Sequence, residues 1–174
     1  MPLTESEKLT WLWEHARIEQ TMLRFGRALD LGDWPSYRSC LTDRIRVDFE
    51  RLTGFPEIEV DADAWVRFAE LALSPVMRHH QYTNFSADIS SDHAVATTYM
   101  VARHRRLTDR GSPDNTQYGW YETGWLKLGG EWKMSRLSHQ FVWIAGNDAL
   151  FDFTAPELAA QMSIVFCAEN LVSR

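Results

Sequence analysis

Cysteine, excess basic charge and long apolar runs are scarce in this 174-residue sequence, and each absence excludes a class of protein. Its two cysteines, Cys40 and Cys167, form no CxxC pair, so neither a disulfide framework nor a cysteine metal site is indicated. The net charge of −6 argues against a nucleic-acid or acidic-membrane partner. No apolar stretch approaches the length of a membrane span, and the N-terminus lacks the pattern of a secretory signal. We therefore expect a cytoplasmic protein.

Cofactor signatures are missing as well. The sequence contains no GxGxxG motif, no P-loop and no lysine context typical of pyridoxal phosphate, which predicts a protein that works without a cofactor. Aromatic residues, in contrast, are frequent, with eight Trp, nine Phe and five Tyr. So many rings fill a core or line a pocket for a flat apolar ligand. The length and the 45% hydrophobic content predict a single domain over residues 1–174.

The order of the expected elements predicts an α+β fold. The "TESE" capping box opens a helix that runs to about residue 31, and its apolar stripe comprises Leu9, Leu12, Ala16, Leu23 and Gly26. A second helix begins with Asp33 as its cap and Pro35 in its first turn. Other expected helices cover residues 61–73 and 155–170, and expected strands cover 44–50, 77–89, 93–107, 116–128 and 131–144. Helices followed by a sheet predict a curved sheet that wraps the helices.

The adjacent histidines of "SPVMRHHQYTN" lie in one of these strands. Neighbouring strand residues point to opposite faces, so only one of His79 and His80 can face the interior. Asp30 lies toward the buried side of the first helix, where an ionised carboxylate is costly unless it is paired. Either Asp30 is half-exposed at the helix end, or it meets the inward histidine. In the second case the carboxylate fixes the tautomer of the imidazole and leaves its other nitrogen as a general base.

Three segments resemble the SnoaL-like group of the nuclear transport factor 2-like superfamily: "MLRFGRALDLGDWPSYRSCLTDRIRVDF", "RHHQYTN" and "YGWYETGWLKLGGEWKMSRLSHQFVWIAGN". The resemblance extends over about residues 8–153. It implies a cone-shaped α+β barrel, in which a strongly curved mixed sheet wraps about three N-terminal helices, plus a C-terminal helix. In the dehydratases and dehydrochlorinases of this group an Asp–His pair acts on a buried small molecule. By position, the resemblance implies Asp30 and His80 as this pair, with Asn84 four residues after the histidine.

Three positions depart from those relatives. Leu29 and Phe49 stand where scytalone dehydratase carries tyrosines, which argues against that particular activity. Leu137 stands where the dehydrochlorinases carry an arginine. The neighbouring Arg136 would face the other side of the sheet unless a bulge shifts the register.

Further residues are candidates for the same pocket. Tyr121 and His139 are predicted as the catalytic acid or polariser, with a core tyrosine as the alternative for Tyr121. The predicted substrate-binding residues are Asn84, Trp34, His104, Gln117, Trp125 and Met100. Together, His80, His104 and His139 suggest a three-histidine metal site, but no HxH or HxxxH spacing supports one, so no metal is predicted.

These residues predict a lyase that needs no cofactor, a dehydratase or related β-elimination enzyme acting on a small aromatic or polycyclic compound. His80 would be the base and Asp30 would orient it. The same pair would also serve an isomerase or a polyketide-cyclase-type enzyme. Small subunits of ring-hydroxylating dioxygenases share the fold without performing chemistry, and a ligand-binding protein with a vestigial Asp–His pair is a further alternative. From the resemblance we also expect a homodimer or homotrimer.

Overall fold

Capping residues determine where the first helices of the computed structural model begin and end; the structure describes residues 4–109 and 111–172. Thr4 and Glu7 exchange the hydrogen bonds of the predicted capping box at the start of α1, and Gly32 ends this helix in the left-handed conformation (φ 69°). Asp33 then caps α2. The helices are α1 (Glu5–Leu31), α2 (Trp34–Ser39), α3 (Glu50–Thr53), α4 (Ala62–Leu73) and α5 (Pro156–Val165), and a 3₁₀ turn, η1 (Ala168–Asn170), follows.

One six-stranded mixed sheet organises the rest of the chain. Its strands are β1 (Leu41–Asp48), β2 (Ile58–Asp61), β3 (Met77–Ser90), β4 (His93–Arg105), β5 (Asp114–Leu128) and β6 (Glu131–Gly146). They lie in the order β2-β1-β6-β5-β4-β3, with β1 and β6 parallel and every other pair antiparallel. The predicted α+β architecture with a curved mixed sheet is confirmed.

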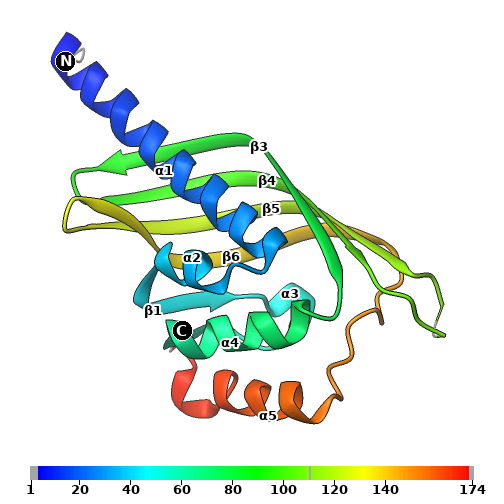
Figure 1. The fold of residues 1–174 in the computed structure, drawn as a ribbon. Helices are drawn as coiled ribbons and strands as arrows, with labels where there is room; N and C mark the ends of the chain where they lie inside the picture. The colour runs from blue at the N-terminus through cyan, green and yellow to red at the C-terminus, as the bar shows by residue number, and fades with distance from the viewer. Residues whose placement is uncertain (1–3, 110, 173–174) are drawn as a thin grey trace.

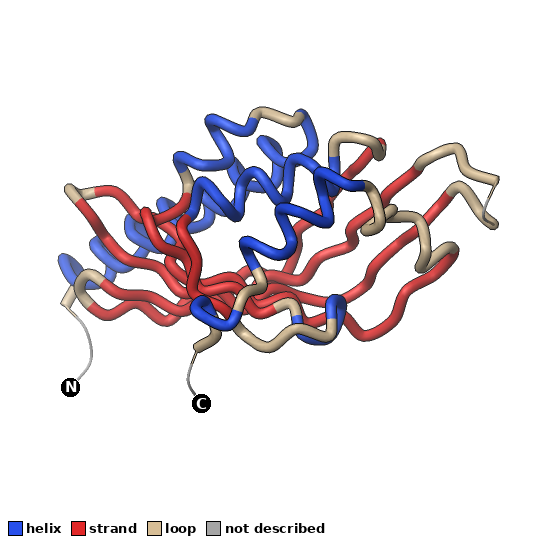
Figure 2. Tube along the Cα trace, turned by 90° about the horizontal axis from the view of Figure 1, so that it is seen from below, coloured by secondary structure: helices blue, strands red, loops and turns tan. Residues whose placement is uncertain are grey.

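The helices cover one face of this sheet. Figure 1 shows α1 crossing the long strands β3 to β6, with α4 and α5 stacked beside β1. Seen from below, the curved strands form a trough and α1, α2 and α4 lie on its inner side (Figure 2). The buried core lies between these two layers, and it includes Phe25, Ile45, Trp65 and Met134. None of the helices in residues 4–109 and 111–172 is both long and apolar enough to cross a membrane.

The apolar stripe predicted for the first helix is wrong for four of its five residues. Leu9 is 66% exposed, and Leu12, Ala16 and Leu23 are also exposed; only Gly26 is buried, and the buried side of α1 carries Ile18 and Met22. The first turns of α1 extend beyond the sheet (Figure 1), and farther along the helix the buried side is rotated away from the predicted one, so Leu23 faces outward.

Short elements and one helix end also differ from expectation. The helix α3 and the strand β2, each four residues long, were not predicted, because so few residues show no periodicity. The last helix ends at Val165 rather than near residue 170. There the amide of Asn170 donates hydrogen bonds of 3.0 Å to the carbonyls of Ile164 and Val165, which completes the final turn.

Candidate active site

Two close contacts bring the end of α1 against β3. The guanidinium of Arg78 donates to the carbonyl of Leu29 at the end of α1 (2.6 Å) and to that of Leu73 at the end of α4 (2.6 Å). The ring of Tyr82 lies directly on Gly26, where a Cβ would overlap the ring. The helix therefore approaches the strand closely enough for Asp30 to reach a side chain of β3.

Asp30 and His80 form the central contact of the site. Nδ1 of His80 lies 2.7 Å from one carboxylate oxygen of Asp30, and the backbone N–H of His80 donates to both oxygens at 3.1 and 3.0 Å. The His80 side chain is only 4% exposed, and that of Asp30 is 25% exposed. His79 is exposed on the opposite face of β3. Of the two adjacent histidines, His80 is thus the inward one.

The hydrogen bonds keep Asp30 ionised. Burial opposes the charge, but the side-chain and backbone hydrogen bonds from His80 outweigh it, so the pKa of Asp30 is lowered. An ionised carboxylate can only accept hydrogen bonds, so Nδ1 of His80 carries the proton in this arrangement. The other ring nitrogen, Nε2, then has a free lone pair, which is the state a general base needs.

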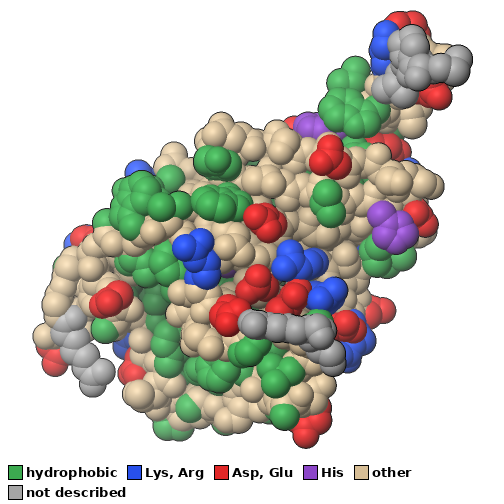
Figure 3. Space-filling view, turned by 180° about the vertical axis from the view of Figure 1, so that it is seen from behind, with side chains coloured by type: hydrophobic (Ala, Val, Ile, Leu, Met, Phe, Trp, Pro, Cys, Tyr) green, Lys and Arg blue, Asp and Glu red, His purple; other side chains and the backbone are tan. Residues whose placement is uncertain are grey.

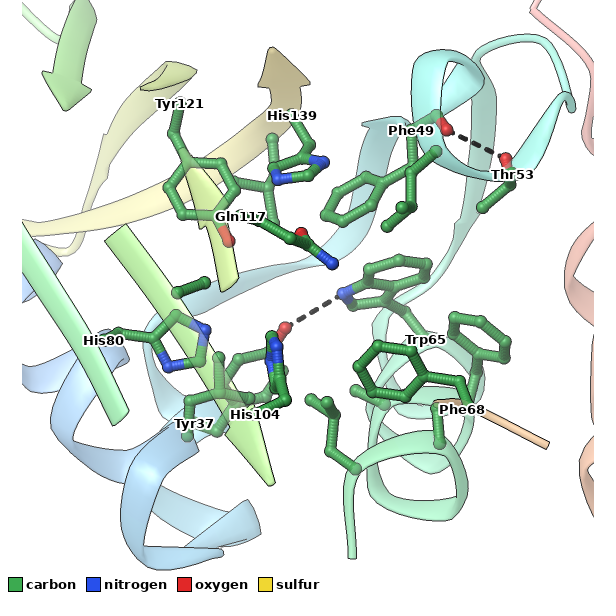
Figure 4. A pocket seen from close by; sticks show the side chains of 18 of the residues that line it. Tyr37, Phe49, Thr53, Trp65, Phe68, His80, His104, Gln117, Tyr121 and His139 are labelled. Atoms are coloured by element: carbon green, nitrogen blue, oxygen red, sulfur yellow. Dashed lines mark hydrogen bonds between the residues drawn. The ribbon is translucent and has the colours of Figure 1, made fainter. Parts of the chain in front are cut away.

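A small cavity of about 100 Å³ opens in front of His80. Figure 4 shows the His80 ring facing this space from β3, with aromatic rings of α2 and α4 and that of Phe49, which precedes α3, around it. Most of its walls are apolar, and they include Phe25, Phe49, Trp65 and Phe68. The segment between β6 and α5 adds Phe151 and Phe153, while α5 itself contributes no lining residue.

Four other predicted site residues, His104, Gln117, Tyr121 and His139, also line the cavity. Burial, helped by the neighbouring His80, lowers the pKa of His104 to about 4. Burial likewise lowers the pKa of His139 to about 3, and this ring stacks on Phe49 at 4.9 Å between centroids. Burial raises the pKa of Tyr121, with a further contribution from the charge of Asp30. Around neutral pH both histidines are therefore uncharged, and Tyr121 keeps its proton.

The remaining predicted substrate-binding residues do not line the cavity. Asn84 is exposed with φ 51°, because a bulge between Thr83 and Ser86 breaks the alternation that would have turned it inward. Trp34 lies outside the cavity, under the guanidinium of Arg78. Trp125 and Met100 are fully buried members of the hydrophobic core, away from the lining. For these four positions the sequence-based expectation is corrected.

Tyr37 and Trp65 were not predicted from the sequence, yet both line the cavity. The indole N–H of Trp65 donates to the hydroxyl of Tyr37 at 3.1 Å, as the dashed line in Figure 4 marks. No usable sequence signal pointed to Tyr37: it shares a helix face with Trp34, three residues earlier, but Trp34 itself lies outside the cavity. Trp65 reaches the cavity because α4 packs against α2, and no local sequence pattern indicates this packing.

The positions that depart from the family relatives are apolar walls of the cavity. Leu29, Phe49 and Leu137 all line it. Arg136 points to the other side of the sheet and pairs with Glu57 at 2.7 Å, so it brings no positive charge to this site. Although three histidines border the cavity, no group of three His, Cys, Asp or Glu in the described ranges is arranged to hold a metal ion.

Comparison with known families agrees with this architecture. A family model described as a SnoaL-like domain matches residues 11–138. The chain belongs to this family. A search of curated proteins found no match for this SnoaL-like chain.

Several solved structures superpose on the SnoaL-like chain. A protein from Kribbella flavida shares 22% identity with a TM-score of 0.74, over 78% of this chain and 94% of that one. A proposed scytalone dehydratase from Novosphingobium aromaticivorans shares 21% identity (TM-score 0.66; 80% and 91% covered). A type 2 hexachlorocyclohexane dehydrochlorinase shares 15% identity (TM-score 0.69; 80% and 93% covered). At these identities the similarity establishes the fold alone.

Proposed function

We propose that this SnoaL-like protein is a lyase that needs no cofactor, a dehydratase or related β-elimination enzyme for a small aromatic or polycyclic compound. The contact between Asp30 and Nδ1 of His80 carries the proposal, because it leaves Nε2 as a base beside an apolar cavity. Solved structures named as a dehydratase and a dehydrochlorinase share the fold, which supports this class of reaction.

In the proposed reaction His80 removes a proton from a substrate carbon or phenol. The electron pair of that bond moves into the conjugated system and expels the leaving group, which departs with its own bonding pair. Asp30 stays ionised and stabilises the imidazolium that forms. Tyr121 donates a hydrogen bond or a proton to the departing oxygen, since its raised pKa keeps its hydroxyl protonated. The same base would also serve an isomerisation or ring closure, which product analysis distinguishes from elimination.

Turnover of hydroxylated aromatic, polyketide-like and steroid compounds tests this proposal. The His80→Ala variant should lose about 10²–10⁴-fold in rate, because a positioned general base contributes that much. Asp30→Asn should also lose activity, because an amide can donate a hydrogen bond to Nδ1 and so favour the wrong tautomer. The neighbouring His79→Ala is the matched control and should retain full activity, since His79 faces solvent. Equal loss in both histidine variants, or none in His80→Ala, would contradict the proposal.

We also propose that the protein forms a homodimer or homotrimer. If it were instead the scaffold subunit of a dioxygenase, it would copurify with an iron–sulfur partner and show no dyad-dependent turnover.

A further inference from the structure

The charges around the cavity restrict what it can bind. Among the described residues that line it, none is Lys, Arg, Asp or Glu. His104 and His139 are uncharged around neutral pH, because burial lowers the pKa of each. Asp30 lies directly behind His80 and adds a negative charge to this surrounding. Two arginines lie nearby without lining the cavity: Arg51 of α3 is exposed over the Phe141 ring, and the Arg78 guanidinium donates to backbone carbonyls; the charge of Arg51 acts on His139 and that of Arg78 on His104.

A carboxylate or phosphate in this cavity would therefore lose its water without contacting a cationic side chain of the lining. Burial of an unpaired ion is costly, and the negative Asp30 would add repulsion. An ammonium group would have no direct contact with Asp30, because Asp30 does not line the cavity and both of its oxygens are engaged by His80. An uncharged ligand avoids both costs.

Size gives a second restriction. The cavity measures about 100 Å³, and an apolar cavity of about 150 Å³ in a protein core holds one benzene molecule. The cavity is partly open to solvent, so a substituted single ring would fit with part of it in the mouth, whereas a second ring would lie largely outside. The walls suit a flat ring, since Phe49, Trp65 and Phe68 present aromatic surfaces to the cavity (Figure 4), and Phe151 also lines it.

Polar atoms within these walls indicate where ligand oxygens would bind. The Tyr37 hydroxyl accepts from Trp65, so its own proton remains free to be donated. Nδ1 of His104 and Nδ1 of His139 are buried and have no hydrogen-bond partner in the part of the chain that the structure describes. Unpaired buried polar atoms are costly, and a ligand that pairs with them gains affinity. Figure 4 shows His104 and Tyr37 near His80, with His139 across the cavity.

We propose that this site selects uncharged, single-ring compounds that carry hydroxyl or carbonyl oxygens, and that Tyr37 is a specificity-determining residue which donates a hydrogen bond to one of those oxygens. This inference rests on the proposed function in one respect: both use the same cavity. Ligand binding there does not require that His80 catalyse a reaction. It narrows the substrate from aromatic compounds in general to neutral monocyclic ones.

Calorimetric titration with a matched set of probes tests the inference at pH 7.5. The probes are 4-hydroxybenzyl alcohol (neutral), 4-hydroxybenzoate (anion), 4-hydroxybenzylamine (cation) and 6-hydroxymethyl-2-naphthol (neutral, two rings). The neutral single ring should bind at least about tenfold more tightly than each of the others, since each of them adds an unpaired charge or excess volume.

The Tyr37→Phe variant should bind the neutral probe about fivefold more weakly, which is the usual effect of losing one hydrogen bond. Tyr99→Phe, on the outer face of the sheet, is the matched control and should bind as the wild type does. Equal or tighter binding of the anion, the cation or the naphthol would overturn the inference, as would no binding of any probe or an unchanged affinity in Tyr37→Phe.

These results separate the inference from the proposed function. Selective binding of the neutral ring without turnover of any compound leaves the inference intact and contradicts the lyase. Turnover of an anionic substrate that depends on His80 would support the lyase and contradict the inference that the site selects uncharged compounds.

Discussion

The three histidines of the cavity differ because their partners differ. Nδ1 of His80 contacts a carboxylate, whereas Nδ1 of His104 and Nδ1 of His139 have no partner among the described residues. Burial lowers the pKa of His104 to about 4 and that of His139 to about 3; a hydrogen bond with Asn115 and the charges of Asp30 and Asp48 oppose these shifts but do not outweigh burial. The site thus combines one imidazole that contacts a carboxylate, His80, with two, His104 and His139, that stay uncharged around neutral pH.

This difference makes acid destabilise the folded protein. A histidine in the unfolded chain titrates near pH 6.5, so between that pH and the lowered values the unfolded state binds more protons than the folded state. The free energy of unfolding should fall as the pH drops below about 6.5, by up to about 1.4 kcal/mol per pH unit for each buried histidine. Chemical denaturation at pH 7.5 and pH 5 measures this loss.

Replacement of His139 by phenylalanine should reduce that acid sensitivity, because one titrating group is removed while the stacking on Phe49 is kept. The exposed His79→Gln variant serves as control and should lose stability in acid as the wild type does. Identical pH dependence in wild type and His139→Phe would refute this reading of the histidines.

At the level of elements, the approach of α1 to β3 depends on a glycine. Tyr82 occupies the space that a Cβ at Gly26 would take. Gly26→Ala should therefore destabilise the protein by about 1–3 kcal/mol through overpacking, against the gain of up to about 1 kcal/mol that alanine normally brings to a helix interior. Thermal and urea unfolding measure the change.

Two further variants make this test specific. Gln20→Ala lies on the exposed side of the same helix and should be neutral or slightly stabilising. Adding Tyr82→Leu to Gly26→Ala should recover part of the loss, because the ring that overlaps the new methyl is gone. A Gly26→Ala variant as stable as the wild type would show that the helix can shift away from the strand at little cost.

On the scale of the whole molecule, the outer face of the sheet carries stacked aromatic pairs. Tyr99 stacks on Trp120 at 6.0 Å, and Tyr118 stacks on Trp143 at 4.5 Å between centroids. Tyr99 is 48% and Trp143 53% exposed, and Figure 3 shows hydrophobic side chains beside a group of basic and acidic ones on this face. An exposed apolar patch of this kind is typical of an interface.

If a second copy of the chain covers this face, Trp143→Glu should shift the protein toward the monomer, because a buried unpaired charge disfavours association. Light scattering after size exclusion measures the mass. Ile164→Glu, on the exposed side of α5, is the control and should leave the mass unchanged. An unchanged mass in Trp143→Glu, or a monomeric wild type, would exclude this interface.

Local signals predicted much of this architecture, and long-range packing accounts for what they missed. Caps such as Asp33 and alternating strands fixed most element bounds. The exposed Leu9 was misplaced because periodicity does not show where the sheet ends. The prediction for Asn84 was wrong because a bulge in β3 breaks the alternation of the strand. Tyr37 was missed because its position in the cavity depends on Trp65, which comes from a later helix. The inward position of His80 followed from strand alternation together with the family resemblance.

Nitrogen-15 NMR of the histidine side chains at pH 8 tests the central claim most directly, with His80→Gln used to assign the signals. The arrangement predicts that His80 carries its proton on Nδ1, donates it to Asp30 and keeps Nε2 unprotonated, and that Asp30→Asn shifts the proton toward Nε2. A His80 protonated on Nε2, or one whose signals Asp30→Asn leaves unchanged, would contradict a base built from these two residues.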